Sequence, residues 1–460
     1  MQKESLLQTK DLRQLTHQFR GGAASPVETC AAVFDRIEQR NPELNAFSLL
    51  CMEDAASAAR ASETRWKNGE PLSPIDGVPC TVKDLVLSKD WPTTFGSAVL
   101  GQNTPSNEDS PVVARLKQAG AVIVGLTTTP ELGWKAVTDS KRFGITRNPW
   151  DISKTPGGSS GGAAAAAAAD LGVLHVGTDG GGSIRIPASF CGIVGHKPSF
   201  GRVPAYPISA FGTVAHVGPM ARTVYDTAAM LSVISQSDSR DWYALKPDSI
   251  RYEDHLETSL KGKKFGYSLD LGHIDVAPQI ADAFLSAIKV FETLGAEVIE
   301  VTAPINPCQS IFHDHWFAGA GYRIRHLDGS QKAQLDPGLI EIATQGQDIS
   351  LHQYIQAGQI RAELGAKMIE FHETYDYLLT PTTPIPAFDA GLEFPAESNN
   401  TRWTDWAGFS YPFNLTQQPA CSVPCGFTDQ GLPIGLQIVG PRYADLEVLQ
   451  AAYAFEQAYA

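Results

Sequence analysis

Cysteine is scarce in this sequence, and its distribution does not suggest a disulfide framework. The 460 residues include 7 cysteines. Because this number is odd and the cysteines are scattered, full pairing is excluded and a reduced, cytoplasmic setting is expected. Cys421 and Cys425 are close in sequence, but no second Cys or His pair follows at zinc-finger spacing, and no HExxH occurs. No metal site is therefore expected.

Charged residues are also few, and no basic cluster is present. They make up 19% of the chain, and the formal net charge is −14 with 36 basic residues spread along it. An acidic protein without a basic stripe repels phosphate backbones, so direct nucleic-acid binding is not expected. With 43% hydrophobic residues, 41 glycines and 30 prolines, the composition is typical of a loop-rich globular enzyme.

Long apolar runs, linkers and repeats are absent from the sequence. The longest apolar stretch, residues 163–176, contains Asp170 and falls short of the ~20 residues that a membrane span requires. No apolar run follows residues 1–5, so a signal peptide is not expected. Because no Pro/Ser-rich or charged segment divides the chain, one large domain over residues 1–460 is expected.

Hydrophobic periodicity predicts helices first and then alternating helices and strands. Residues 1–70 have apolar residues at helical spacing. Ser110 followed by Pro111 is typical of a helix start, and residues 121–124 form an apolar run typical of a buried strand. The same order recurs later, with strands expected at 263–267 and 296–301 and a helix between them. This alternation indicates an α/β fold with a sheet covered on both faces.

The segment from Pro156 to Pro198 contains the residues most suited to chemistry. Gly161 and Gly162, followed by seven alanines, predict a helix that begins just after Ser159. A strand is expected next, at residues 171–176, and three glycines then precede Ser183. Consecutive glycines let backbone N–H groups converge on a developing oxyanion, so Ser183 is a candidate nucleophile.

A serine nucleophile needs a base, and Lys83 is one candidate because apolar and small residues precede it. Burial would lower the pKa of this lysine toward a useful range, although an ion pair with Asp84 is an equally simple interpretation. The glycines could instead form a phosphate or cofactor loop, or a purely structural turn. However, neither the P-loop order nor the GxGxxG order is present.

A second interpretation gives Ser159 the nucleophilic role. The run from Gly157 to Gly161 matches GxSxG, the nucleophile elbow of α/β-hydrolases, and it precedes an expected helix. In that case a downstream acid and a histidine would complete a triad, and the protein would be an α/β-hydrolase-type esterase.

The motifs around these residues resemble the amidase-signature family. The resemblance is most specific at residues 156–202, which contain GGSSGG and GTDGGGSIRIPASFCGIVGHKPSFGR. Weaker resemblance extends to GVPCTVKDL around Lys83, GPMARTVYDTAAML at 218–231, YDYLLTPTTP at 375–384 and LPIGLQIVGPR at 432–442. It therefore covers most of the chain, and it favours a serine amidase with a Ser-cisSer-Lys triad over the esterase.

The resemblance implies both a fold and a set of site residues. The implied fold is a single α/β domain in which a mixed twisted sheet lies between layers of helices, with a catalytic core at 75–232. Lys83 is implied as the base, Ser159 as a bridging serine after a cis peptide bond, and Ser183 as the nucleophile. The oxyanion hole is implied at Gly180, Gly181 and Gly182, together with the N–H of Ser183. Supporting roles fall to Ser160, Thr178, Asp179 and Arg185, and no cofactor or metal is implied.

The implied activity is hydrolysis of a carboxylic amide to acid and amine through an acyl-enzyme on Ser183. Two aromatic segments, 305–325 and 386–413, are expected to be substrate-pocket loops. They favour bulky aryl or alkyl amides, anilides or carbamates as small-molecule substrates. The candidate pocket residues are Trp134, Trp316, Phe317, Trp403 and Trp406. Gly180 is smaller than the residue often found there in the family, which affects the expected pocket shape.

Two further alternatives share the same residues. The chain could be the A-type subunit of a glutamine-dependent tRNA amidotransferase, which would require partner subunits. It could also be a binding protein that keeps an inactive amidase fold, although all three catalytic positions are intact. A homodimer is common in the family and is the oligomeric state that the resemblance implies.

Overall fold

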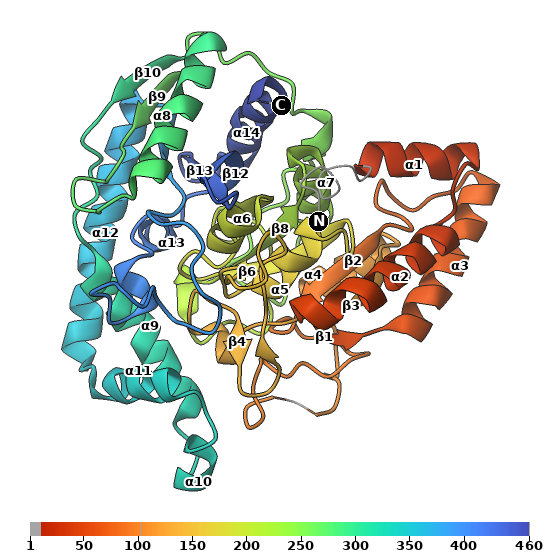
Figure 1. Ribbon diagram of the computed structural model, residues 1–460, viewed down its shortest axis with the longest axis horizontal. Coiled ribbons are helices and arrows are strands. Elements are labelled where there is room, and N and C mark those ends of the chain that lie inside the picture. The colour runs from red at the N-terminus through yellow and green to blue at the C-terminus, as the bar shows by residue number, and fades with distance from the viewer. Residues whose placement is uncertain (1–10, 102, 460) are drawn as a thin grey trace.

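The computed structural model describes residues 11–101 and 103–459, and its centre is a sheet of eleven strands (Figure 1). In spatial order the strands are β1 (Phe47–Leu50), β3 (Val122–Thr127), β2 (Pro79–Lys83), β6 (Leu174–Asp179), β8 (His216–Ala221), β7 (Val194–Lys197), β12 (Ala420–Phe427), β13 (Pro433–Val439), β11 (Tyr377–Pro381), β9 (Lys264–Tyr267) and β10 (Glu297–Glu300). A separate two-stranded sheet contains β4 (Asp139–Ser140) and β5 (Gly144–Ile145).

The main sheet is mixed, as the resemblance implied. Strands β3, β2 and β6 are parallel at one end, and β11, β9 and β10 are parallel at the other. Between them, β8, β7, β12 and β13 run antiparallel to their neighbours. Thus two parallel regions flank an antiparallel centre. Strands from the last part of the chain, β12 and β13, lie in that centre between β7 and β11.

The described part of the N-terminal segment, residues 11–70, contains three helices and one strand. The helices are α1 (Leu12–Gly21), α2 (Pro26–Leu44) and α3 (Met52–Asn68). Ser25 caps α2 through a reciprocal hydrogen-bonded box with Glu28, which satisfies amides that the helix leaves free. Residues 1–70 were expected to be helical, and β1 is the exception because it adds an antiparallel edge strand to β3. Residues 1–10 of that segment, including 1–5, lie outside the described residues.

One face of the sheet is covered by α4 (Pro111–Gln118), α7 (Val224–Ile234), α8 (Pro278–Thr293) and α14 (Asp445–Tyr459). Apolar side chains of these helices and of the strands beneath them form the largest hydrophobic cluster. The strands expected at 263–267 and 296–301 are β9 and β10, and α8 is the helix between them. Ser110 caps α4, with its Oγ 3.4 Å from the N–H of Val113.

The opposite face carries α5 (Gly161–Ala168) and α6 (Arg185–Cys191). Every residue of α5 is buried, and its small side chains let the helix approach the sheet closely. A Cβ added to Gly162 would lie 2.5 Å from the backbone nitrogen of Thr128 and 2.6 Å from the carbonyl oxygen of Ala46. Close packing of this kind tolerates no added carbon there, so α5 begins directly against the end of β3.

A second group of helices lies on the side of the molecule away from α1, α2 and α3, on the left of Figure 1. It contains α9 (Gln309–Ile324), α10 (Gly329–Lys332), α11 (Pro337–Asp348), α12 (Leu351–Thr374) and α13 (Tyr411–Leu415). Residues 305–325 were expected to be a loop, but most of them form α9. Because α9 is buried on several sides, its apolar residues do not follow a single helical stripe. Residues 386–413 contain only the short turn η5 (Trp403–Asp405) and the start of α13.

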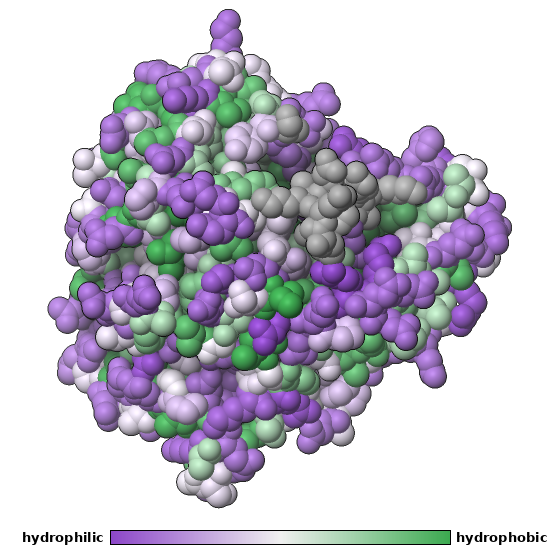
Figure 2. Space-filling model, in the orientation of Figure 1, coloured by the Kyte–Doolittle hydropathy of each residue, from purple (hydrophilic) through white to green (hydrophobic). Residues whose placement is uncertain are grey.

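Polar residues cover most of the face shown in Figure 2, with apolar residues scattered among them. Within residues 11–101 and 103–459, no helix combines the length and the apolar character needed to cross a bilayer.

Candidate active site

Lys83 is the last residue of β2, and its amino group lies among three hydroxyls. The side chain is fully buried. Its Nζ is 2.7 Å from Ser159 Oγ, 2.8 Å from Ser160 Oγ and 2.9 Å from Thr178 Oγ1. Strand β6 is the parallel neighbour of β2 and supplies Thr178, while the two serines immediately precede α5. Residues distant in sequence thus meet at the ends of neighbouring strands.

Burial lowers the pKa of Lys83 well below its ordinary value, and nearby Asp179 offsets only part of this effect. Asp84 is not the partner of Lys83 among the described residues. Its carboxylate accepts hydrogen bonds from the N–H of Thr94, at 2.7 Å, and from the Thr94 hydroxyl. The structure of residues 11–101 and 103–459 therefore lacks the ion pair that the sequence allowed, and burial raises the pKa of Asp84 to about 6. A buried lysine held by hydroxyls is suited to accepting a proton.

Ser183 lies after the glycines that follow β6, and a backbone contact connects it to the other serine segment. The N–H of Ser160 donates to the carbonyl oxygen of Ser183 at 3.1 Å. The peptide bond between Gly158 and Ser159 is cis, as the resemblance implied. Ser159 and Ser183 line the same cavity, and no hydrogen bond joins their hydroxyls in the described part of the chain.

The GxSxG interpretation is not compatible with these contacts. Ser159 Oγ accepts a hydrogen bond from Lys83 Nζ, and among the described residues it makes no hydrogen bond to a histidine. The α/β-hydrolase triad requires such a histidine as the base.

Asp179 and Arg185 form a buried ion pair beneath the glycine loop. Arg185 Nη2 lies 2.9 Å from Asp179 Oδ1, and both side chains are 0% exposed. Burial alone would raise the pKa of Asp179, but the charge and hydrogen bonds of Arg185 outweigh it and hold the pKa well below its usual range. The guanidinium also donates to Asn414 Oδ1 and Gln437 Oε1, each at 2.7 Å. The loop is thereby tied to residues near the end of the chain.

The same carboxylate determines which backbone amides remain available. The N–H of Gly182 donates to Asp179 Oδ1 at 2.8 Å, so it cannot also face an oxyanion. This contact argues against the predicted role of Gly182. In contrast, the N–H groups of Gly180, Gly181 and Ser183 make no hydrogen bond within the described part of the chain. Unpaired backbone N–H groups beside a candidate nucleophile are one requirement of an oxyanion hole.

We expect Arg185→Met to destabilise the protein by about 3–5 kcal/mol, because it leaves the Asp179 carboxylate buried without its counter-charge. Urea unfolding followed by circular dichroism measures this change. Lys67→Met is the matched control, since Lys67 pairs with Glu63 on the surface and its side chain is 70% exposed; little change is expected there. Equal effects of the two substitutions would contradict the assigned role of the buried pair.

Trp316 of α9 forms one wall of the cavity beside Gly180. A Cβ added to Gly180 would lie 2.5 Å from Trp316 Cζ3, so the missing side chain at position 180 makes room for the indole ring. The ring stacks on Phe211 with centroids 3.8 Å apart, and its Nε1 donates to the carbonyl oxygen of Trp134 at 3.0 Å. These contacts fix the ring in a single orientation.

The other four predicted pocket aromatics do not line this cavity. Trp134, Phe317, Trp403 and Trp406 belong to the second hydrophobic core. Trp406, for example, stacks on Phe190 with ring centroids 5.9 Å apart. The spacing of these aromatic residues along the chain could not distinguish core positions from pocket positions, because both environments favour large aromatic side chains.

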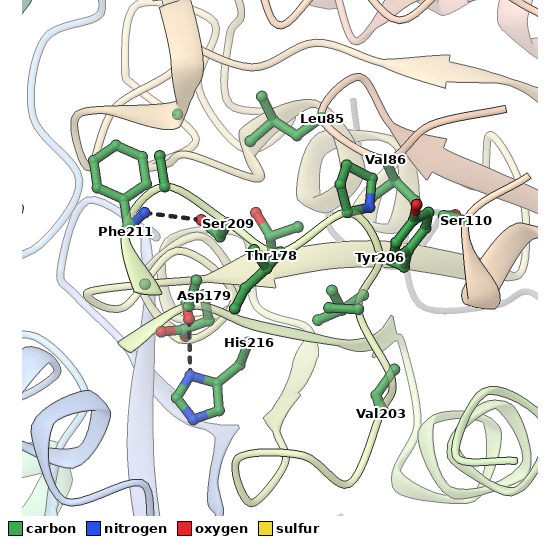
Figure 3. A pocket seen from close by; sticks show the side chains of 18 of the residues that line it. Leu85, Val86, Ser110, Thr178, Asp179, Val203, Tyr206, Ser209, Phe211 and His216 are labelled. Atoms are coloured by element: carbon green, nitrogen blue, oxygen red, sulfur yellow. Dashed lines mark hydrogen bonds between the residues drawn. The ribbon is translucent and has the colours of Figure 1, made fainter. Parts of the chain in front are cut away.

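The cavity has a volume of about 220 Å³, and a loop outside the predicted pocket segments supplies much of its lining. Residues 199–212 follow β7 and contribute Tyr206, Ser209 and Phe211, opposite Leu85 (Figure 3). Ile208 in this loop is 56% exposed. The only sequence signal for this loop was a run of apolar residues without strand or helix periodicity, directly after the segment from Pro156 to Pro198.

The chain is similar to known proteins over most of its length. The family model Amidase matches residues 28–449. An acylamidase of Rhodococcus erythropolis is 36% identical over 441 residues, covering 94% of this chain and 92% of that protein. The A-type subunit of the glutamyl-tRNA(Gln) amidotransferase of Synechococcus sp. (strain JA-2-3B'a(2-13)) is also 36% identical, covering 97% of this chain and 91% of its relative.

Solved structures resemble this fold over almost its full length. A bacterial aryl acylamidase of the amidase-signature enzymes superposes with a TM-score of 0.90 at 31% identity, covering 98% of this chain and 96% of that one. The 6-aminohexanoate cyclic dimer hydrolase superposes with a TM-score of 0.88 at 27% identity, covering 98% and 97%.

Proposed function

Because the chain belongs to the amidase family, it is an enzyme that hydrolyses amides, and we propose that it cleaves small aryl or alkyl amides through an acyl-enzyme on Ser183. The observation that carries this proposal is the contact of 2.7 Å between Ser159 Oγ and the buried amino group of Lys83. Ser159 and Ser183 both line the cavity, so only the Ser159 hydroxyl stands between the candidate base and that cavity.

In the proposed reaction, Lys83 begins in its neutral form, which its burial favours. Lys83 takes the proton of Ser159, and Ser159 takes the proton of Ser183 as the Ser183 oxygen attacks the amide carbon. The return of the proton along the same path to the leaving nitrogen releases the amine. Water then repeats the sequence on the acyl-enzyme and releases the acid, so Lys83 acts as base and then as acid in each half.

The negative charge that develops on the carbonyl oxygen would be held by the free N–H groups of Gly180, Gly181 and Ser183. Each such donor is commonly worth about 3 kcal/mol of barrier. Asp179 supports this arrangement indirectly. It holds Gly182 in place, and Arg185 neutralises its charge so that it does not repel the oxyanion.

The cavity lining favours an apolar substrate of modest size. Trp316 and Phe211 form a flat aromatic wall near Gly180, and Leu85 and Leu132 contribute aliphatic surface. Apolar walls with few polar groups are typical of small-molecule sites. An acylamidase and an aryl acylamidase are among the similar proteins, which supports an anilide or acyl amide. Carbamate cleavage, a homodimer and a cytoplasmic setting stay predictions.

The second candidate is a role as the A-type component of a tRNA amidotransferase, because components of that type are similar over nearly their whole length. The same serines and lysine would then release ammonia from glutamine, and partner subunits would be required. The inactive-fold alternative is disfavoured, because Lys83, Ser159 and Ser183 are present in one buried site.

The test is hydrolysis of para-nitroacetanilide by the purified chain alone, beside amidation of glutamyl-tRNA with glutamine and the partner subunits of a known amidotransferase. We expect the lone chain to release para-nitroaniline with multiple turnovers and to fail in the tRNA assay. Silence on a panel of anilides and acyl amides, together with tRNA amidation in the presence of partners, would instead support the amidotransferase role.

A further inference from the structure

Helix α9 presents three residues on the face that borders the cavity. Trp316, Gly319 and Arg323 are spaced by three and four residues, so they share one side of the helix. A Cβ added to Gly319 would lie 2.8 Å from the carbonyl oxygen of Ala210 and 2.8 Å from Phe211 Cδ1, so the cavity loop rests on the helix at this point. Both Trp316 and Arg323 line the cavity.

The distance between these two residues follows from helix geometry. Seven residues of α-helix rise by about 10 Å, which is two turns. Trp316 touches the space beside Gly180, next to the free amides. Arg323 therefore lies about two turns farther along α9 from that point, on the same side of the helix.

No counter-charge accompanies the positive charge of Arg323 within residues 11–101 and 103–459. Its guanidinium Cζ lies 5.2 Å from the ring centroid of Phe95, another cavity residue, and it makes no hydrogen bond or ion pair within the described part of the chain. Burial, followed by repulsion from Arg325, lowers the pKa of Arg323. An arginine that has lost part of its hydration without gaining a partner favours a bound anion.

The two carboxylates that line the cavity are already engaged. Asp179 is paired with Arg185, and Asp241 accepts the N–H groups of Ala205 and Tyr243, each at 2.9 Å. The charged side chain that acts on Arg323 is instead Arg325, which has the same sign and repels it. No carboxylate that lines the cavity is therefore left to pair with this guanidinium.

We propose that Arg323 binds a carboxylate of the substrate, so that the preferred substrates are amides whose acyl or amine portion ends in a carboxylate about two helical turns from the scissile bond. The inference rests on the proposed function, because it assumes that hydrolysis occurs in this cavity. Planar guanidinium and carboxylate groups can form two parallel hydrogen bonds, which gives selectivity for this anion. The aromatic wall of Trp316 and Phe211 would contact the apolar chain between the two ends.

The experiment uses two series of substrates. The first compares mono-para-nitroanilides of dicarboxylic acids, from succinate to sebacate, with their methyl esters. The second compares N-acyl derivatives of ω-amino acids with their esters. We expect wild type to prefer the acid over its ester by about tenfold or more in kcat/KM, mainly through KM, in at least one series. The preference is expected to peak at one chain length. Arg323→Gln should abolish it, and Arg325→Gln, on the exposed neighbour, should retain it. No preference in wild type, or a preference that survives Arg323→Gln, would overturn the proposal.

A binding measurement separates this proposal from the proposed catalysis. Calorimetric titration of the Ser183→Ala protein with a dicarboxylate mono-anilide and with its methyl ester requires no turnover. Tighter binding of the acid that is lost in the Ser183→Ala, Arg323→Gln double variant would support the carboxylate site even if hydrolysis failed. Equal binding of acid and ester would refute the site while leaving the proposed hydrolysis to its own test.

Discussion

Ser183→Ala is expected to lower kcat for anilide hydrolysis by about 10,000-fold or more, because the proposed acyl-enzyme cannot form without the Ser183 oxygen. Ser183 is only 6% exposed and lines the cavity, and the loss of one hydroxyl leaves the nearby backbone unchanged. The fold should therefore be retained while turnover is lost. Release of para-nitroaniline, measured beside the unfolding midpoint of the same preparation, tests both parts of the expectation.

The matched control for this substitution is Ser189→Ala. Ser189 is a buried serine of α6, and its Oγ lies 3.4 Å from Thr383 Oγ1, away from the cavity lining. We expect it to keep wild-type turnover. A denaturing mass spectrum of protein mixed with a slowly deacylating ester should show an added acyl group on wild type and none on Ser183→Ala. Acylation that persists in the variant would place the nucleophile elsewhere.

Lys83→Met should lower kcat/KM by about 1,000-fold or more, since it removes the only base in the proposed proton path while keeping a side chain of similar length. The substitution also removes an amino group from a fully buried position. Unfolding in urea determines whether the variant is folded at the assay temperature, so that lost catalysis is separated from lost structure. Lys197→Met is the matched control, because Lys197 is equally buried and donates to the backbone carbonyls of Pro198 and Gln418.

The pH dependence of wild type gives a second measure of the same residue. Only neutral Lys83 can accept a proton, so kcat/KM should be low at acid pH and rise as the pH passes the pKa of Lys83. Because burial holds that pKa well below the ordinary value, the rise is expected at a lower pH than for an exposed lysine. Full activity in Lys83→Met would exclude Lys83 as the base, and a rise only near the pKa of a free lysine would contradict the lowered pKa.

Much of the fold could be predicted from local patterns. Ser110 before Pro111, and the helix between two short strands at 263–301, appear in the structure as predicted because capping and periodicity act over a few residues. The order of the strands in the sheet could not be predicted in this way. The pairing of β12 with β7 depends on contacts between residues more than two hundred positions apart, which no local pattern records.

The candidate active site could likewise be predicted only in part. The glycines and Ser183 were evident because a run of glycines before a serine is unusual. Lys83 was one candidate base from its apolar surroundings in the sequence, and the resemblance favoured that role over an ion pair with Asp84. The pocket was mostly not predicted. Trp403 and Trp406 had the expected aromatic character, yet they lie in the core. Residues 199–212 line the cavity because of where the fold places their loop, and not because of a pattern in their sequence. The predicted role of Gly182 is disfavoured because one carboxylate, Asp179, accepts its amide hydrogen.

The central position of β12 and β13 has a consequence for synthesis on the ribosome. Six strands, from β1 to β7 in spatial order, can pair as soon as residues up to 221 have emerged, and β9 with β10 and β11 can form a second ribbon. The two parts cannot join until residues 420–439 arrive between them. Those residues include Gln437, which anchors Arg185 below the glycine loop. A nascent chain would therefore remain catalytically silent and would expose unpaired strand edges until its translation is nearly complete, which makes this interval the point at which chaperones are most needed.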